Sequence, residues 1–261
     1  MKYSVCIDAL FMNKGSFADA MKAVKSAGYE AVEFWAWWDK DMDLFRKVQQ
    51  DLNLKVATFC TKFVNPGDPS LQQAYLDGLK ESIQVAQKLE CDTLIAQAGW
   101  EFESFQKEIT REQHRRTFLD TMRKASELVE KDGMTLVIEP LNLLVNHPGY
   151  HLSTSADAFA VIDQIGSPNV KILFDIYHQQ ITEGNLIMNI TNNIGKIGHF
   201  HAAGNPGRNE ITKGEIHYRH VFEAISKLGY DRYVGLEYMT DEDPVPGLIE
   251  AKNTILVQVR K

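Results

Sequence analysis

Four side chains that could bind a metal ion or move a proton stand at the ends of strand-like segments. They are Glu139, Asp175, His201 and Glu237, and each comes just before a loop signal such as Pro140. Three carboxylates at one point would repel one another and raise one another's pKa unless a divalent cation shared them. Two Glu, one Asp and one His make an oxygen-rich ligand set that suits Mn²⁺ or Mg²⁺, with Co²⁺ able to substitute. The alternative is that each residue satisfies its own hydrogen bonds at a strand end.

These four residues belong to a regular alternation of short apolar runs and longer amphipathic stretches. Such alternation is typical of βα units around a parallel sheet. Helix starts are indicated by Ser16 with Asp19 and by Ser70, and glycines mark several helix ends. The eight strand-like runs are residues 3–8, 31–36, 55–60, 92–97, 135–140, 170–175, 197–202 and 233–238.

Eight such units in 261 residues match the number and size of a (β/α)8 barrel. We therefore predict an α/β fold, a TIM barrel, with residues 1–261 as a single domain. A doubly wound open sheet is the alternative, but the G-x-G-x-x-G and Walker A patterns are absent. In a TIM barrel the active site lies at the carboxyl ends of the strands, where the last four runs would bring the four candidate ligands together.

Composition restricts the class of partner. The formal charge of −7 and the pI of about 5.6 argue against a general nucleic-acid or anionic-membrane binder. The N-terminal segment has no signal-peptide pattern, and no run of 18 apolar residues occurs. The three cysteines form no C-x-x-C pair, so we expect reduced thiols in a cytoplasmic protein. We expect a small-molecule substrate, and the sequence leaves the oligomeric state open, a homo-oligomer included.

Four segments carry a resemblance to a known family: IEPLN, FDIYH, HFHAAGNPGR and GLEY. They resemble the xylose isomerase-like TIM barrels, and within them the hydroxypyruvate isomerases. The nearest match runs from about Glu139 to Tyr238, whereas the first half is similar mainly in its alternation. The resemblance implies a metal-dependent isomerase, with hydroxypyruvate to tartronate semialdehyde as the favoured reaction. The ketose 3-epimerases share the same pattern and come second, and a dehydratase on the same barrel is a further alternative.

The resemblance also assigns residues. It implies metal ligation by the four candidate ligands, with Glu139 and Glu237 acting in addition as catalytic acid/base groups. His178 and Arg208 match positions that contact substrate oxygens. One departure affects the substrate: hydroxypyruvate isomerases carry glutamine where His201 stands, while ketose 3-epimerases carry histidine.

Several neighbouring side chains have no fixed role from the sequence. We expect His199 to be a buried, hydrogen-bonded residue, because it lies two positions before His201 on the same strand face. A tryptophan near the pocket could exclude water from a reactive intermediate or simply pack. An acidic residue after Arg208 could orient it or lie free at the surface. The residues left open in this way are Glu33, Trp35, Trp100 and Glu210.

Overall fold

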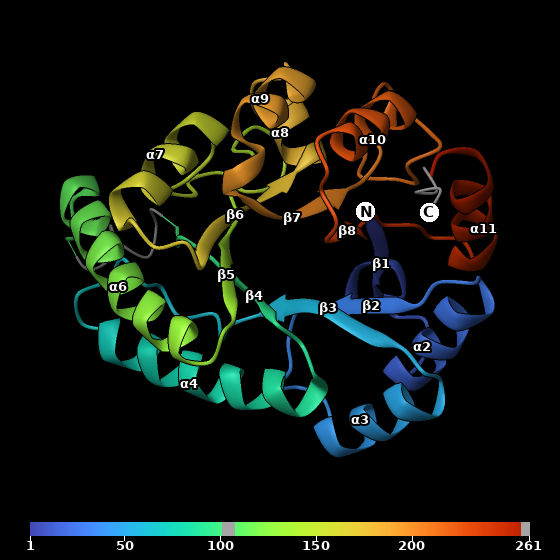
Figure 1. Ribbon diagram of the computed structural model, residues 1–261, viewed down its shortest axis with the longest axis horizontal. Coiled ribbons are helices and arrows are strands. Elements are labelled where there is room, and N and C mark those ends of the chain that lie inside the picture. The colour runs from blue at the N-terminus through green and yellow to red at the C-terminus, as the bar shows by residue number, and fades with distance from the viewer. Residues whose placement is uncertain (101–107, 257–261) are drawn as a thin grey trace.

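The computed structural model describes residues 1–100 and 108–256, and its parallel strands close into a barrel (Figure 1). Each strand pairs with the next along the chain, and the last pairs with the first. This confirms the predicted α/β TIM barrel. The strands are β1 (Lys2–Cys6), β2 (Ala31–Phe34), β3 (Lys55–Cys60), β4 (Thr93–Ala96), β5 (Thr135–Ile138), β6 (Val170–Asp175), β7 (Ile197–Ala202) and β8 (Tyr233–Leu236).

Helices surround the barrel and cover the outer face of the sheet (Figure 1). The main apolar core fills the layer between these helices and the strands, as burial of apolar area requires. The helices of the described residues are α1 (Ile7–Leu10), α2 (Phe17–Ser26), α3 (Met42–Asp51), α4 (Gln72–Leu89), α6 (Arg111–Lys131), α7 (Ser155–Ile165), α8 (Ile176–Thr182), α9 (Leu186–Asn193), the 3₁₀ helix η1 (Ile194–Lys196), α10 (Tyr218–Lys227) and α11 (Pro244–Thr254).

Local signals explain several element boundaries. Ser16 caps α2, because its side chain accepts the N–H of Asp19, as predicted. Ser70 does not cap α4: its hydroxyl donates to the Asp68 carboxylate, and the helix begins two residues later. The predicted strand over residues 3–8 is wrong at its end, because residues 7–10 turn into α1.

The barrel interior has an apolar part and a polar part. One cluster consists of Cys60, Ile95, Val137 and Leu173, all buried. The polar part consists of Ser4, Glu33 and His199, which are buried and joined by hydrogen bonds. Glu33 also lies 3.2 Å from His201 Nε2, which links these residues to the carboxyl end of the barrel. This polar part lies beside the residues that form the candidate site.

Candidate active site and metal centre

The four candidate ligands come together at the carboxyl end of the barrel. Each offers one ligand atom, and these atoms lie within 4.8 Å of one another. The fold produces this convergence, because Asp175 and His201 are register partners on β6 and β7, while Glu139 and Glu237 are the first residues after β5 and β8. All four are buried. A cavity of about 300 Å³ opens next to three of them, Glu139, His201 and Glu237.

The two carboxylate oxygens of Asp175 have different partners. Oδ1 caps α8 by accepting the backbone N–H groups of Tyr177 and His178, at 2.7 and 3.1 Å. Oδ2 lies 3.5 Å from His178 Nε2. The cap fixes the orientation of the side chain, and one oxygen of Asp175 lies within 4.8 Å of the other candidate ligand atoms.

His201 lies between the two glutamates. Its Nδ1 is 3.5 Å from Glu139 Oε1 and 3.3 Å from Glu237 Oε2. Glu139 Oε1 and His201 Nδ1 are buried and have no hydrogen-bond partner of acceptable geometry. Buried polar atoms are normally satisfied, so such a pair demands an explanation. A divalent cation shared by these atoms provides one, and the donor set of three carboxylates and an imidazole fits it.

The electrostatics of the two glutamates differ. Burial raises the pKa of Glu139 to about 7, with Glu237 and Asp175 adding to the shift and His201 opposing it. Burial acts on Glu237 in the same direction, but His201 and Arg208 outweigh it and hold its pKa well below the ordinary value. Two carboxyl groups whose pKa values are pushed apart are typical of acid/base sites.

Glu237 is held by side chains from two other loops. Trp35, just after β2, donates its indole N–H to Glu237 Oε1 at 2.6 Å. Arg208 donates to Glu237 Oε2 and places its guanidinium over the Tyr177 ring, 5.6 Å from the centroid. The Arg208 side chain is only 13% exposed, so its charge faces the cavity rather than solvent.

His178 is fully buried and lines the same cavity. Its Nδ1 lies 3.3 Å from the backbone N and 2.5 Å from the side-chain nitrogen of Asn142. Because both of those groups are donors, Nδ1 is the acceptor and Nε2 carries the proton. Burial and the nearby Arg208 lower the pKa of His178 well below its usual range. His178 therefore offers a neutral N–H donor.

The structure distinguishes the residues whose roles the sequence left open. Trp35 lines the cavity, whereas Trp100 packs on Tyr150 at 5.0 Å between ring centroids and is not a lining residue. Glu210 neither orients Arg208 nor lies free: it is buried and binds Lys213 and Thr240.

His199 is buried and hydrogen-bonded, as expected, and its partner is Glu33. The sequence did not identify His147, Cys60 or Met239 as lining residues. None of them belongs to a recognisable motif: Cys60 is the last residue of β3, whereas His147 and Met239 lie in loops.

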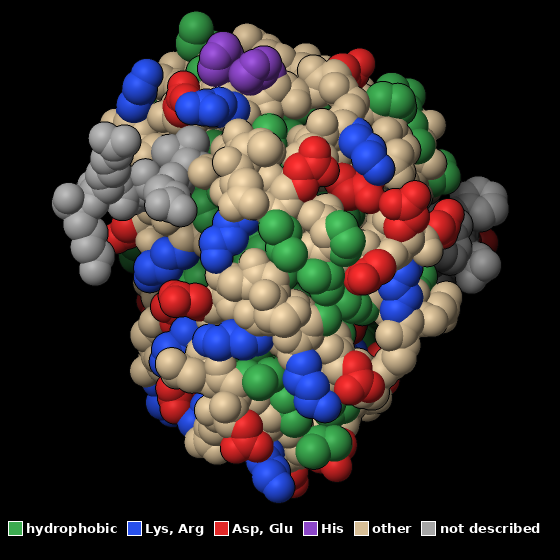
Figure 2. Space-filling model, turned by 90° about the vertical axis from the view of Figure 1, so that its right-hand side faces the viewer, with side chains coloured by type: hydrophobic (Ala, Val, Ile, Leu, Met, Phe, Trp, Pro, Cys, Tyr) green, Lys and Arg blue, Asp and Glu red, His purple; other side chains and the backbone are tan. Residues whose placement is uncertain are grey.

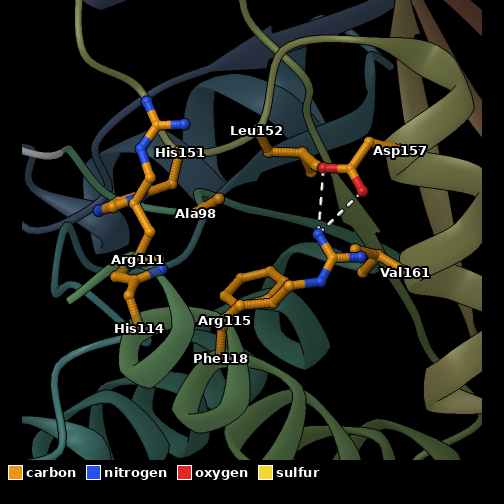
Figure 3. Close-up of a pocket in the computed structure, with 9 residues that line it drawn as sticks. All are labelled: Ala98, Arg111, His114, Arg115, Phe118, His151, Leu152, Asp157 and Val161. Carbon is orange, nitrogen blue, oxygen red and sulfur yellow. Dashed lines mark hydrogen bonds and ion pairs between the residues drawn. The ribbon is translucent and has the colours of Figure 1, made fainter.

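A second cavity, of about 220 Å³, lies between α6 and α7 (Figure 3). It shares no lining residue with the candidate site. Its polar groups already have partners: Arg115 donates twice to Asp157, at 2.8 and 3.1 Å, and His114 lies 3.1 Å from Asn65 Oδ1. This arrangement indicates a structural link between the two helices.

On the side that carries α2, α10 and α11, basic and acidic side chains are interspersed (Figure 2). Among residues 1–100 and 108–256, no helix combines the length and apolarity needed to cross a membrane.

Comparisons with known proteins agree with this geometry. The family described as xylose isomerase-like TIM barrel matches residues 21–255. The hydroxypyruvate isomerase of Escherichia coli K12 is 30% identical over 262 residues, which cover 95% of this chain and 97% of that protein. The 2-oxo-tetronate isomerase of Cupriavidus necator is 30% identical, covering 88% and 90%. A solved structure described as AP endonuclease, family 2, from Brucella melitensis has a TM-score of 0.88 at 26% identity, covering 98% and 100%.

Proposed function

This chain belongs to the xylose isomerase-like TIM barrel family, and we propose that it is a metal-dependent isomerase of a small hydroxy-carbonyl compound. The favoured reaction converts hydroxypyruvate to tartronate semialdehyde through an enediolate. The observation that carries the proposal is the convergence of Glu139, Asp175, His201 and Glu237, with three of their buried atoms lacking hydrogen-bond partners. The names of the two isomerases above agree with this class of reaction.

We assign the metal to the four converging side chains, with Mn²⁺ or Mg²⁺ as the ion and Co²⁺ able to substitute. A divalent ion held there supplies a Lewis acid that stabilises negative charge on substrate oxygens.

Proton transfer between adjacent carbons falls to a carboxylate. Glu139 would bind the ion through one oxygen and keep the second oxygen free to accept a proton and return it. In hydroxypyruvate it takes a proton from C3 and returns one to C2, while a hydroxyl proton passes from the C3 oxygen to the C2 oxygen. The neutral Nε2–H of His178 donates to one of these oxygens.

Glu237 is the second acid/base group. Its low pKa keeps it ionised, and Trp35 and Arg208 fix its position.

Arg208 is the substrate-binding cation of the proposal. Its planar guanidinium can donate two hydrogen bonds to a carboxylate. It lines a cavity of about 300 Å³, which suits a three- or four-carbon acid. Hydroxypyruvate and 2-oxo-tetronate both carry the carboxylate that Arg208 would recognise.

Epimerisation of a ketose at C3 is the second candidate, favoured by one residue. His201 stands where the resemblance gives glutamine to hydroxypyruvate isomerases and histidine to ketose 3-epimerases. Epimerisation would use Glu139 and Glu237 from opposite faces of the substrate. A nuclease is disfavoured by the net charge of −7. A dehydratase would reveal itself by the loss of water from the substrate.

One experiment separates these reactions. Purified protein loaded with Mn²⁺ is incubated in deuterated water with hydroxypyruvate, 2-oxo-tetronate and several ketoses, and products are followed by NMR and mass spectrometry. We expect conversion of an oxo acid with deuterium at the carbon that was C2, whereas a 3-epimerase would label C3 of a ketose. Glu139→Gln and Glu237→Gln should each abolish turnover. Wild-type rates in either variant would refute the assignment.

Two further proposals concern the cellular compartment and the domain organisation. The three cysteines are free and buried, which suits the reducing cytoplasm. Residues 1–261 act as one domain, because the described strands close a single barrel.

A further inference from the structure

Glu33 reaches across the barrel interior to two histidines of another strand. It stands on β2, whereas His199 and His201 stand on β7, and β1 and β8 lie between these strands. Glu33 Oε2 is 2.9 Å from His199 Nε2, and Glu33 Oε1 is 3.2 Å from His201 Nε2. The side chains of all three residues are only 2% exposed. The contacts are therefore shielded from water. The contact with His199 is a hydrogen bond, whereas the one between Glu33 Oε1 and His201 Nε2 is a close ion-pair contact without hydrogen-bond geometry.

The two intervening strands, β8 and β1, carry small residues where the Glu33 side chain crosses them. Gly235 on β8 is the register partner of both His201 and Ser4. A Cβ atom at Gly235 would overlap the Glu33 carboxylate, so the path of the side chain needs a glycine there. Ser4 on β1 is small and donates its hydroxyl to Glu33 Oε2 at 3.1 Å. The neighbouring strands thus leave space for the Glu33 carboxylate and supply one hydrogen-bond donor to it.

The contact decides which nitrogen of His201 is free. An ionised carboxylate only accepts hydrogen bonds, so the imidazole nitrogen facing it carries a proton. Nε2 of His201 faces Glu33, and Nδ1 faces Glu139 and Glu237. When a cation is held by Glu139 and Glu237, a neutral His201 that keeps its proton on Nε2, toward Glu33, would have its lone pair on Nδ1, directed at that cation. Carboxylates that fix metal-ligating histidines in this manner typically change metal affinity by about 10–100-fold.

We propose that Glu33 is a positioning residue, which holds His201 through Nε2–H so that Nδ1 is presented as a metal ligand. The inference rests on the proposed function, since it takes His201 to be a ligand. Glu33 itself touches neither the metal nor the substrate. His199 occupies the other carboxylate oxygen and so prevents Glu33 from rotating away from His201.

The test compares three variants of the full chain. Glu33→Leu keeps the approximate side-chain volume but removes both carboxylate oxygens. Gly235→Ala retains the Glu33 carboxylate, but the added Cβ atom moves it away from His201. Ser4→Ala is the matched control, because it removes a hydrogen bond to the same carboxylate but leaves both imidazole contacts. Cooperative thermal unfolding identifies the variants that retain the fold, and Gly235→Ala decides the question if Glu33→Leu does not fold.

Three readouts follow. Calorimetric titration with Mn²⁺ should show affinity reduced by about 10–100-fold in Glu33→Leu and Gly235→Ala, and within about threefold of wild type in Ser4→Ala. The visible spectrum of the Co²⁺-loaded variants should change, because a ligand is lost or reoriented. In the protein loaded with diamagnetic Mg²⁺, ¹⁵N spectra of the histidine rings should show a neutral His201 with its proton on Nε2 in the wild type, and a weaker preference for this tautomer in Glu33→Leu.

Folded Glu33→Leu or Gly235→Ala protein with wild-type Mn²⁺ affinity and an unchanged Co²⁺ spectrum would overturn the inference. The proposed function fails in a different way. If wild-type protein binds neither Mn²⁺ nor Co²⁺, the metal centre itself is wrong. If wild type binds the ions and the Glu33 variants bind them equally well, only the role of Glu33 is wrong.

Discussion

The hydrogen bond from Trp35 to Glu237 gives a quantitative prediction for catalysis. The indole N–H donates to Glu237 Oε1 at 2.6 Å, and the carboxylate is buried. Hydrogen bonds to charged groups contribute about 1.5–3 kcal/mol. Trp35→Phe removes the donor but keeps an aromatic ring. If the bond is needed in the transition state, this loss corresponds to a reduction in kcat of about 10–100-fold, with each factor of ten equal to about 1.4 kcal/mol.

Trp37→Phe is a matched control for this prediction. Trp37 is also half-buried and donates its indole N–H, but to Ser82 Oγ at 3.0 Å and away from the cavity. We expect it to lower the free energy of unfolding by about 1 kcal/mol and to leave kcat unchanged.

The assay follows product formation by NMR with the compound that the wild-type protein converts, at saturating Mn²⁺. Equal kcat values for the two folded variants would refute the idea that the indole holds Glu237 for catalysis.

Three further predictions address the substrate, the metal and a buried histidine. Arg208→Ala should raise KM for an oxo acid by about 10–100-fold and change KM for a neutral ketose far less. Equal effects in steady-state kinetics would contradict a carboxylate-binding role. Chelation should abolish activity, and Mn²⁺ at a hundred times its Kd should stabilise the fold by about 2.7 kcal/mol in calorimetry. Asp175→Asn should reduce this gain, and an undiminished gain would place the ion elsewhere. Burial, with His151 nearby, lowers the pKa of His114 to about 3, so its contribution to stability is complete above the unfolded pKa of about 6.5 and falls as the pH drops from there toward 3. Urea unfolding should show that about 2 kcal/mol of the loss between pH 8 and pH 5 disappears in His114→Gln; an unchanged loss would show that His114 is not the group responsible.

The sequence was sufficient for the barrel and for the convergence of its ligands. Strand-like runs at a regular spacing can bury both faces only in a parallel sheet covered by helices, so their number led to the fold. Barrel closure then places the carboxyl ends of β5 to β8 side by side. For this reason, Glu139, Asp175, His201 and Glu237 could be placed together before any coordinates were known.

Contacts across the barrel and between loops depended on the tertiary structure. Glu33 and His201 are 168 positions apart, and no local pattern links a residue on β2 to one on β7. Trp35 and Glu237 are likewise joined only because the barrel closes between β8 and β1. Glu210 pairs with Lys213 and Thr240 rather than with Arg208, which its position two residues away did not reveal. Periodicity determines which face a strand residue occupies, whereas the partner that it meets there is decided by three-dimensional packing.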